Sequence, residues 1–234
     1  MFTKIDKKNL SEEIVRQLIS RILGGALTPG TKLPPERDLA EQMYVNRNTL
    51  REALKKLELL GLLNVRQGDG IYVLDYRDSG NLELLKYILY TRKKDTPEIL
   101  KDILSIRTLV IPEMAASAAK KISDNEIEML KGILADDSIS IIEKDMAIHM
   151  FIARVSSNLP FMLILNFFND IFRQYADIYF AFEENRNVTN RFHKSITESL
   201  TQKDFKKSKS VMHDVLTYTE QCINSYMEKN YEKS

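Results

Sequence analysis

The spacing of apolar residues changes along this chain and divides it near residue 75. Residues 35–57 show the three- and four-residue spacing of two amphipathic helices, and two short β-prone runs follow at 62–66 and 71–74. Beyond residue 81 the spacing is helical, with no strand pattern. The pattern therefore predicts a mainly α fold, in which an N-terminal domain with a small β-hairpin precedes an all-α helical bundle.

The two N-terminal helices have the spacing of a helix-turn-helix. The first is expected to open at Pro35, which suits a first helical turn, and only residues 44–46 separate it from the second. In the second helix Arg47, Arg51 and Lys55 recur every fourth residue, opposite an apolar stripe. A turn this short lets the second helix cross the first and project its N-terminal residues into a DNA major groove. The stripe consists of Leu50, Ala53, Leu54 and Leu57.

A hairpin between the two β-prone runs predicts a wing beside this motif. Its turn is Gln67-Gly68-Asp69-Gly70, and glycine permits both a positive φ and a close approach of the backbone to a phosphate. Arginine and asparagine at the start of the second helix can bind guanine and adenine edges, and threonine suits phosphates. We therefore expect a winged helix-turn-helix that binds double-stranded DNA.

Three motifs in this region resemble the DNA-binding domain of GntR-type bacterial transcription regulators. They are Leu33-Pro34-Pro35-Glu36-Arg37-Asp38-Leu39-Ala40, Asn46-Arg47-Asn48-Thr49-Leu50-Arg51-Glu52-Ala53-Leu54 and the glycine-containing wing. Members of this family contact DNA through the arginine of the first motif, the start of the recognition helix and the wing. The resemblance thus implies DNA contacts by Arg37, Asn46, Arg47, Thr49, Arg51, Gln67 and Gly68.

Charge and polarity separate the two parts of the chain. The formal net charge is +1, but residues 1–74 contain 12 Lys and Arg against 9 Asp and Glu, and the remainder contains 22 against 24. DNA affinity is therefore expected in the N-terminal part. The polar segment 76–80 follows the last predicted strand, so we predict domains at 1–75 and 81–234, joined by this linker.

The remaining composition predicts a cytoplasmic bacterial protein without a membrane span. No signal peptide opens the chain, and its most apolar region, 161–182, is interrupted by polar and charged residues. The single cysteine, Cys222, cannot form an intramolecular disulfide, and we expect it to be a small buried residue.

The region after residue 81 is predicted to contain six or seven helices. Starts are indicated at 95–98, at the capping box that opens with Ser123 and at Asp204, and Pro112 predicts a kink in a long helix at 98–121. The absence of a strand pattern in this region argues against an α/β ligand domain. Its motifs resemble the helical effector-binding domain of the FadR branch. They are Ile106-Arg107-Thr108, Asp145 and His149 followed by Asn158-Leu159-Pro160, and His193-Lys194-Ser195-Ile196 with Asp204.

Many members of this branch hold one divalent metal ion with one aspartate and three histidines. The resemblance assigns Asp145, His149 and His193 to such a site, and the first two stand at i and i+4 on one helix face. The fourth ligand is expected at Val215, which cannot bind metal, and His213 lies about 200° away around the helix. One prediction is a Zn or Ni ion with positions open to water or an effector carboxylate; the other is a hydrogen-bonded pair in a polar cavity.

A second resemblance points to an effector that needs no metal. The segment 75–81, the run Ile178-Tyr179-Phe180-Ala181 and the segment Phe192-His193-Lys194 resemble the fatty acyl-CoA-responsive regulators after which the branch is named. Abundant aromatic residues between 151 and 180 suit a long apolar pocket, although helical stripes of Phe and Tyr more often form core.

Together these patterns predict a homodimeric transcription regulator, in its expected form a repressor, that binds a palindromic operator and senses a small carboxylate metabolite. Acyl-CoA is the alternative effector. Asp145, His149 and His193 would also suit a metal-dependent hydrolase. A further alternative is a regulator that responds to no ligand and uses its second domain only for dimerisation. We expect no enzyme activity, because the sequence offers no additional general base near those three residues.

Overall fold

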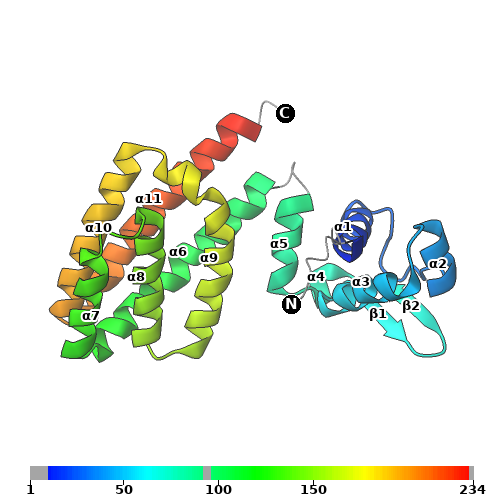
Figure 1. Cartoon of the computed structure of the whole chain (residues 1–234), viewed down its shortest axis with the longest axis horizontal. Helices are drawn as coiled ribbons and strands as arrows, with labels where there is room; N and C mark the ends of the chain where they lie inside the picture. The colour runs from blue at the N-terminus through cyan, green and yellow to red at the C-terminus, as the bar shows by residue number, and fades with distance from the viewer. Residues whose placement is uncertain (1–9, 92–95, 232–234) are drawn as a thin grey trace, which may run out of the picture. The chain divides into compact units, whose positions relative to one another are not determined.

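The computed structural model describes residues 10–91 and 96–231 and divides into two compact units, Met1–Thr96 and Pro97–Ser234 (Figure 1). Both units are built mainly from α-helices, and the sheet found in the described ranges is a two-stranded antiparallel one. The mainly α fold with a small β-hairpin is thereby confirmed. No helix in these ranges combines the length and apolarity that crossing a membrane requires.

Three helices form the core of the first unit: α1 (Leu10–Leu23), α2 (Glu36–Gln42) and α3 (Arg47–Leu59). Helix α3 contacts both α1 and α2, and its predicted apolar stripe is buried. Pro35 precedes α2 as its N-cap instead of opening the helix, because its ψ of 146° is extended. Between the two helices Tyr44 has a φ of 53°, the left-handed conformation that reverses the chain.

The wing consists of β1 (Leu63–Arg66) and β2 (Gly70–Val73), within one residue of the predicted strands. Leu63 pairs with Val73 and Arg66 pairs with Gly70. The other edge of β2 makes a further pairing that the local pattern did not predict. There the backbone N–H of Gly30 donates to the carbonyl of Val73, and that of Leu33 donates to Ile71, both at 2.8 Å. The base of the wing is therefore fixed to the loop that leads into α2.

The segment predicted as a linker begins with a short helix, α4 (Tyr76–Ser79), and α5 (Leu82–Thr91) follows and contacts α1. The hydroxyl of Ser79 donates to the carbonyl of Gly61 at 2.6 Å, and the Asn81 amide donates to that of Leu59 at 2.7 Å. Gly61 has a φ of 75°, and a Cβ there would lie 1.9 Å from the Ser79 carbonyl oxygen, so this approach requires glycine. Residues 76–91 are thus tied to the helices of the first unit, and the compact units divide after Thr96.

Six helices form the described part of the second unit. Helix α10 contacts four of the others, α7, α8, α9 and α11. The starts predicted at Ser123 and Asp204 are confirmed: Ser123 forms a capping box with Glu126, and Asp204 accepts from the backbone N–H of Lys207 at 3.0 Å. Helix α6 continues through Pro112. The bounds are α6 (Thr96–Lys121), α7 (Asp124–Ala135), α8 (Ile141–Val155), α9 (Leu159–Phe180), α10 (Glu183–Thr201) and α11 (Phe205–Tyr231).

Candidate DNA interface and helical-unit sites

The start of α3 is shaped by a side-chain cap. The Oδ1 atom of Asn46 accepts from the backbone N–H of Thr49 at 2.9 Å and from the Thr49 hydroxyl at 3.1 Å. An amide that is to bind adenine bidentately needs both its oxygen and its NH₂ group. While the cap is intact, only the NH₂ group of Asn46 is available to DNA. Two of the predicted contact residues therefore first serve to begin the recognition helix.

The three predicted contact arginines are exposed but differ in how they are held. Arg47, the first residue of α3, makes no ion pair with any described residue. The Nε atom of Arg37 donates to its neighbour Asp38 at 3.2 Å. The Nε atom of Arg51 donates to Glu36, at the start of α2, at 2.6 Å. Only the last of these contacts joins the two helices of the motif.

At the tip of the wing, Gly68 has the positive φ, 78°, that the predicted turn requires. The Oδ1 atom of Asp69 accepts from Lys32 Nζ at 2.9 Å and from the Tyr72 hydroxyl at 3.0 Å. These hydrogen bonds raise the pKa of Lys32 and lower the pKa of Asp69. The guanidinium of Arg66 lies 4.6 Å from the centre of the Tyr72 ring. The wing tip is thus a folded, charged unit and not a loose turn.

A pocket of about 600 Å³ lies between the wing and the start of α2. It is lined by Lys32, Glu36 and Arg66 together with the wing turn 67–70. Two basic side chains, Lys32 and Arg66, therefore border the predicted interface without having been predicted as contacts. Arg66 directly precedes the wing turn, so the sequence could have indicated it as a contact residue. Lys32 lies far from the turn in sequence and is brought there only by folding.

In the helical unit, Asp145, His149 and His193 converge as predicted. The Nε2 atom of His193 lies 2.9 Å from Asp145 Oδ1, and the Nε2 atom of His149 lies 3.9 Å from the same oxygen. All three side chains are buried, and the Nδ1 atoms of both histidines lack a hydrogen-bond partner among the described residues. The His149 ring stacks on Phe192 with centroids 5.4 Å apart. Helices α8 and α10 thus share a closed polar cluster.

A buried arginine, Arg107 of α6, completes this cluster electrostatically. Burial lowers the pKa of Arg107 to about 10, although the charge of Asp145 opposes that shift. Burial alone would raise the pKa of Asp145, but His149, His193 and Arg107 together bring it below its ordinary value. For His149, burial lowers the pKa to about 4 despite the nearby carboxylate. At neutral pH the cluster therefore holds one carboxylate, one guanidinium and a neutral His149.

The cluster provides an incomplete set of metal ligands. Both Nε2 atoms face one carboxylate oxygen, as ligands of a shared ion would. Val215 is buried at the expected fourth position, and His213 is exposed with its Nδ1 3.6 Å from Asp214. In the described part of the chain, no group of three or more His, Cys, Asp and Glu side chains has a geometry suited to a metal ion. The positive charge of Arg107 also disfavours a second cation beside Asp145.

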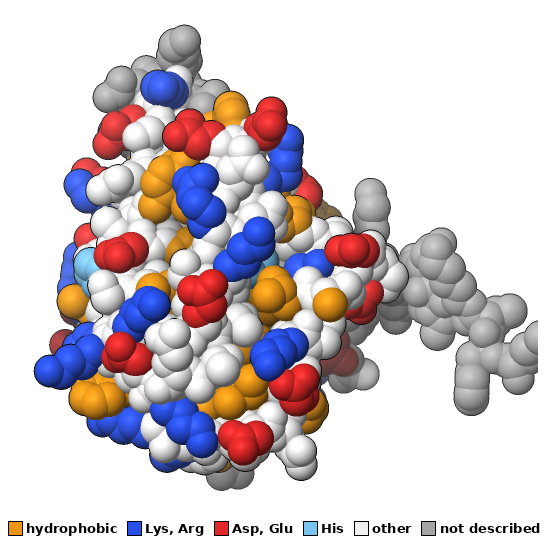
Figure 2. All heavy atoms as spheres, turned by 90° about the vertical axis from the view of Figure 1, so that its left-hand side faces the viewer, with side chains coloured by type: hydrophobic (Ala, Val, Ile, Leu, Met, Phe, Trp, Pro, Cys, Tyr) orange, Lys and Arg blue, Asp and Glu red, His pale blue; other side chains and the backbone are white. Residues whose placement is uncertain are grey.

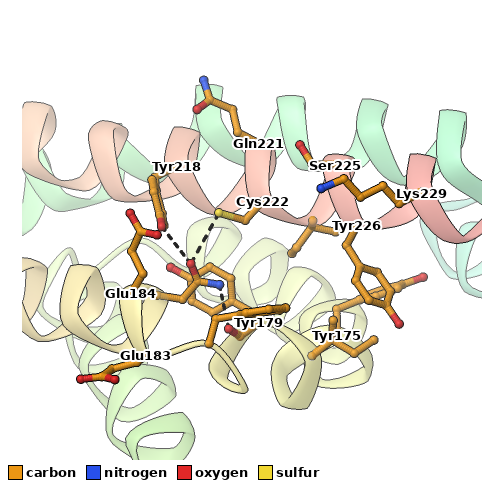
Figure 3. Close-up of a pocket in the computed structure, with 14 residues that line it drawn as sticks. Tyr175, Tyr179, Glu183, Glu184, Tyr218, Gln221, Cys222, Ser225, Tyr226 and Lys229 are labelled. Atoms are coloured by element: carbon orange, nitrogen blue, oxygen red, sulfur yellow. Dashed lines mark hydrogen bonds between the residues drawn. The ribbon is translucent and has the colours of Figure 1, made fainter.

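A pocket of about 480 Å³ lies between the end of α9, the start of α10 and the second half of α11 (Figure 3). Figure 3 shows side chains of α9 and α11 facing one another across it, among them Tyr179 and Cys222. The Tyr218 hydroxyl donates to Asn185 Oδ1 at 2.9 Å, and the Cys222 thiol lies 3.6 Å from the same atom. Burial raises the pKa of Tyr218 to about 12. Cys222 is half-buried at this wall and not enclosed in the core, where it was expected.

The lining of this pocket is mainly apolar and aromatic. The lining also includes two acidic residues, Glu183 and Glu184, and one basic residue, Lys229. The aromatic lining consists of Tyr175, Tyr179, Phe182, Tyr218 and Tyr226. Asp145, His149 and His193 do not line it. The predicted polar cluster and the aromatic pocket are therefore two separate features of the helical unit.

A second groove of the helical unit, about 740 Å³, lies along α7, α8 and α9. Met146, Met150 and Arg154 line it from α8, and Asn and charged residues, including Arg173, line it from α9. On the face drawn in Figure 2, acidic and basic side chains are interspersed. That face has no extended basic surface of the kind that binds a DNA backbone.

Two family models together match nearly the whole described part of this chain. Residues 10–73 match "Bacterial regulatory proteins, gntR family", and residues 74–230 match "FadR C-terminal domain". The HTH-type transcriptional regulator Mce2R of Mycobacterium tuberculosis is 35% identical over 60% of this chain and 57% of its own length. This chain thus spans little more than half of that relative.

Other relatives are covered more completely. The fatty acid metabolism regulator protein of Shewanella sp. (strain MR-7) is 29% identical over 82% of this chain and 80% of its own length. Among solved structures, Lar, described as controlling the expression of the Listeria monocytogenes agr system, matches with a TM-score of 0.58. That match covers 96% of this chain and 99% of the other at 16% identity, so it supports the fold alone.

Proposed function

This chain belongs to the gntR family of bacterial regulatory proteins and carries a FadR C-terminal domain, and from that premise we propose that it is a ligand-responsive transcription regulator. Its first unit binds a specific operator in double-stranded DNA. The observation that carries this proposal is the arrangement of α3 and the wing. A capped recognition helix presents Arg47 and Arg51, and a wing that shares a pocket with the start of α2 presents Gln67 and Gly68.

In this proposal some of these side chains contact bases and others contact phosphates. Arg47 and Arg51 have free N–H groups that can bind the O6 and N7 atoms of guanine. Arg37 and Lys32 suit phosphates, which set the register of the protein on the duplex. The backbone at Gly68 can approach a phosphate closely, because no Cβ stands in the way. A palindromic operator and a homodimer complete the proposal, since two-fold DNA sites are bound by two-fold proteins.

We propose that the effector is a fatty acyl-CoA or a related long-chain acyl compound, bound in the pocket between α9 and α11. Three observations support an acyl effector over a small carboxylate. The pocket is apolar and aromatic, the Asp145 cluster is closed and already balanced by Arg107, and several relatives are named fatty acid metabolism regulators. A ligand acts on DNA binding only through a difference in its affinity for two conformations of the protein.

A small carboxylate sensed through a bound Zn or Ni ion is the second candidate. It is favoured by one observation: the Nε2 atoms of His149 and His193 both face Asp145 Oδ1. With Val215 in place of a fourth ligand, and Arg107 nearby, such an ion would be held weakly. Metal analysis of the purified protein separates the two candidates, and His149→Ala with His193→Ala must abolish any stoichiometric metal found. We propose no catalytic role for these residues, and assaying metal-loaded protein for hydrolase activity checks that.

Selection of DNA by the full-length protein from a random 30-base-pair pool tests the core of the proposal. We expect an enriched sequence with two-fold symmetry, bound about 10³-fold more tightly than a mixed-sequence duplex at the same salt concentration. Arg47→Ala protein provides the control, because it should enrich a less defined sequence. Failure of the wild-type protein to enrich any sequence would contradict the proposed function.

A further inference from the structure

The ion pair between Glu36 and Arg51 links the two helices of the DNA-binding motif. Glu36 is the first residue of α2, and Arg51 lies in the second turn of α3. The Arg51 Nε atom donates to Glu36 Oε2 at 2.6 Å. We propose that Glu36 is a positioning residue that orients Arg51 for base recognition and thereby sets operator specificity. This inference rests on the proposed DNA-binding function.

The contact leaves the outer end of the guanidinium free. An arginine has five N–H donors, and Glu36 occupies the one on Nε, so the four N–H groups of the two Nη atoms remain. The Arg51 side chain is still 57% exposed. A guanine offers two acceptors side by side, which suit a pair of donors that point in one direction. Holding Arg51 by Nε fixes that direction before DNA arrives, which lowers the ordering cost of binding.

The other contact arginines lack an equivalent constraint. Arg37 pairs with Asp38, its neighbour on the same helix, so that contact cannot fix Arg37 relative to α3. Arg47 makes no ion pair with any described residue. The packing of α2 on α3 does not rest on Glu36 alone either, because the two helices are in contact and α2 buries the apolar Leu39 and Ala40. A partly exposed ion pair adds little to stability, so the position of Glu36 is better explained by what it does to Arg51.

The negative charge of Glu36 should also weaken the binding of DNA. Glu36 lines the pocket beside the wing, where the phosphate backbone is expected to pass. Its charge must weaken contact with every DNA sequence alike. Glu36 is therefore expected to reduce affinity for non-specific DNA while it increases the preference for the operator. The two effects have opposite signs, and a purely structural role would not produce that pattern.

The test compares variants of the full-length protein on two probes, the duplex selected by the wild-type protein and a mixed-sequence duplex of equal length. Glu36→Gln should lower the specificity ratio about tenfold and relax base preference at the same positions as Arg51→Ala. Glu41→Gln removes an equal charge from an exposed site on the same helix and should leave that preference unchanged. Glu36→Asp keeps the charge but shortens the side chain, so it should lose specificity without gaining non-specific affinity. Circular dichroism melts check that each variant is folded.

A double-variant cycle decides between positioning and direct reading. In an Arg51→Ala background, Glu36→Gln should have no further effect on base preference, because nothing remains to be oriented. An undiminished effect in that background would overturn the inference and assign base contact to Glu36 itself. An unchanged specificity ratio in both Glu36→Gln and Glu36→Asp would also overturn the inference. If Arg51→Ala still relaxed the base preference in that case, the proposed DNA-binding function would stand. If wild-type protein selects no sequence, the proposed function and this inference fail together.

Discussion

The two units of this protein place their polar chemistry in opposite settings. In the DNA-binding unit the charged side chains are exposed, and Arg51 and Lys32 are each held by one carboxylate at the surface. In the helical unit Asp145, His149 and Arg107 are buried, and the charge of Arg107 acts on the pKa of Asp145. Surface charges can be exchanged at little cost in stability, whereas a buried charge depends on its partners. The first set is therefore available to a ligand such as DNA, and the second set is first a part of the fold.

Removing Asp145 should give the largest effect, because this side chain belongs to the buried set. Asp145→Ala removes the buried carboxylate that His193 contacts and whose charge opposes that of Arg107, and we expect a loss of about 3–5 kcal/mol in the free energy of unfolding. Urea denaturation followed by circular dichroism measures it. Asp137→Ala is the control, because that side chain is almost fully exposed and should cost less than about 0.5 kcal/mol. Equal stability of the two variants would show that the cluster is not structural.

Removing a contact arginine should affect DNA binding and not the fold. We expect Arg47→Ala and Arg51→Ala each to weaken operator binding by about 1–3 kcal/mol, because a bidentate contact with guanine is lost. Fluorescence anisotropy at fixed salt concentration measures the affinity, and urea denaturation should show stabilities close to that of the wild type. If neither variant binds the operator less tightly, α3 does not present the residues that contact the bases.

Local patterns in the DNA-binding unit were easier to predict from the sequence than contacts between residues far apart in the chain, as particular residues show. The stripe from Leu50 to Leu57 and the glycine wing are local patterns, and both appear in the structure as expected. Contacts between residues far apart in the chain could not be predicted from the sequence. Examples are the backbone hydrogen bond of Leu33 with Ile71 and the ion pair of Glu36 with Arg51.

The buried cluster was predicted from the sequence only in part. The convergence of Asp145, His149 and His193 was expected from a family resemblance, and the structure brings them together. The placement of Arg107 beside them was not predicted, since spacing along α6 does not say which helix its side chain will meet. The aromatic residues between 151 and 180 were correctly weighed as mainly core, but Tyr175 and Tyr179 among them also line a pocket.

Acid should affect stability through the buried cluster. The pKa of His149 is lowered to about 4 in the folded protein, against 6.5 for the ordinary side chain. Between these values the unfolded chain binds more protons, so stability rises with pH and falls as pH drops from 6.5 towards 4. We expect a loss of about 2 kcal/mol between about pH 7 and about pH 5 from this group.

His149→Gln isolates that contribution, because glutamine does not titrate in this range. Urea denaturation at neutral and at mildly acidic pH should show a smaller pH dependence for His149→Gln than for the wild type. His213→Gln is the matched control, since His213 is exposed and its replacement should leave the pH dependence as it is. A wild-type protein that is equally stable at both pH values would contradict the burial argument.

Filling the aromatic pocket should have a smaller, selective effect. Ser225 lines the pocket from α11, and Ser225→Phe should weaken an acyl effector about tenfold, or about 1.4 kcal/mol, while leaving operator binding unchanged. Ser210→Phe places the same ring on an exposed part of the same helix and serves as the control. Isothermal titration with palmitoyl-CoA measures the effector affinity. Equal affinities in the two variants would place the effector elsewhere.

Control of DNA binding by an acyl effector is tested most directly by the affinity of full-length protein for its selected operator with and without palmitoyl-CoA, with free coenzyme A as the control. We predict a saturable change of at least about tenfold with palmitoyl-CoA, no change with coenzyme A, and a response that Ser225→Phe shifts to higher concentration. An operator affinity that stays constant at every palmitoyl-CoA concentration, in protein that still binds its operator specifically, would contradict the claim that acyl binding in the helical unit controls DNA binding.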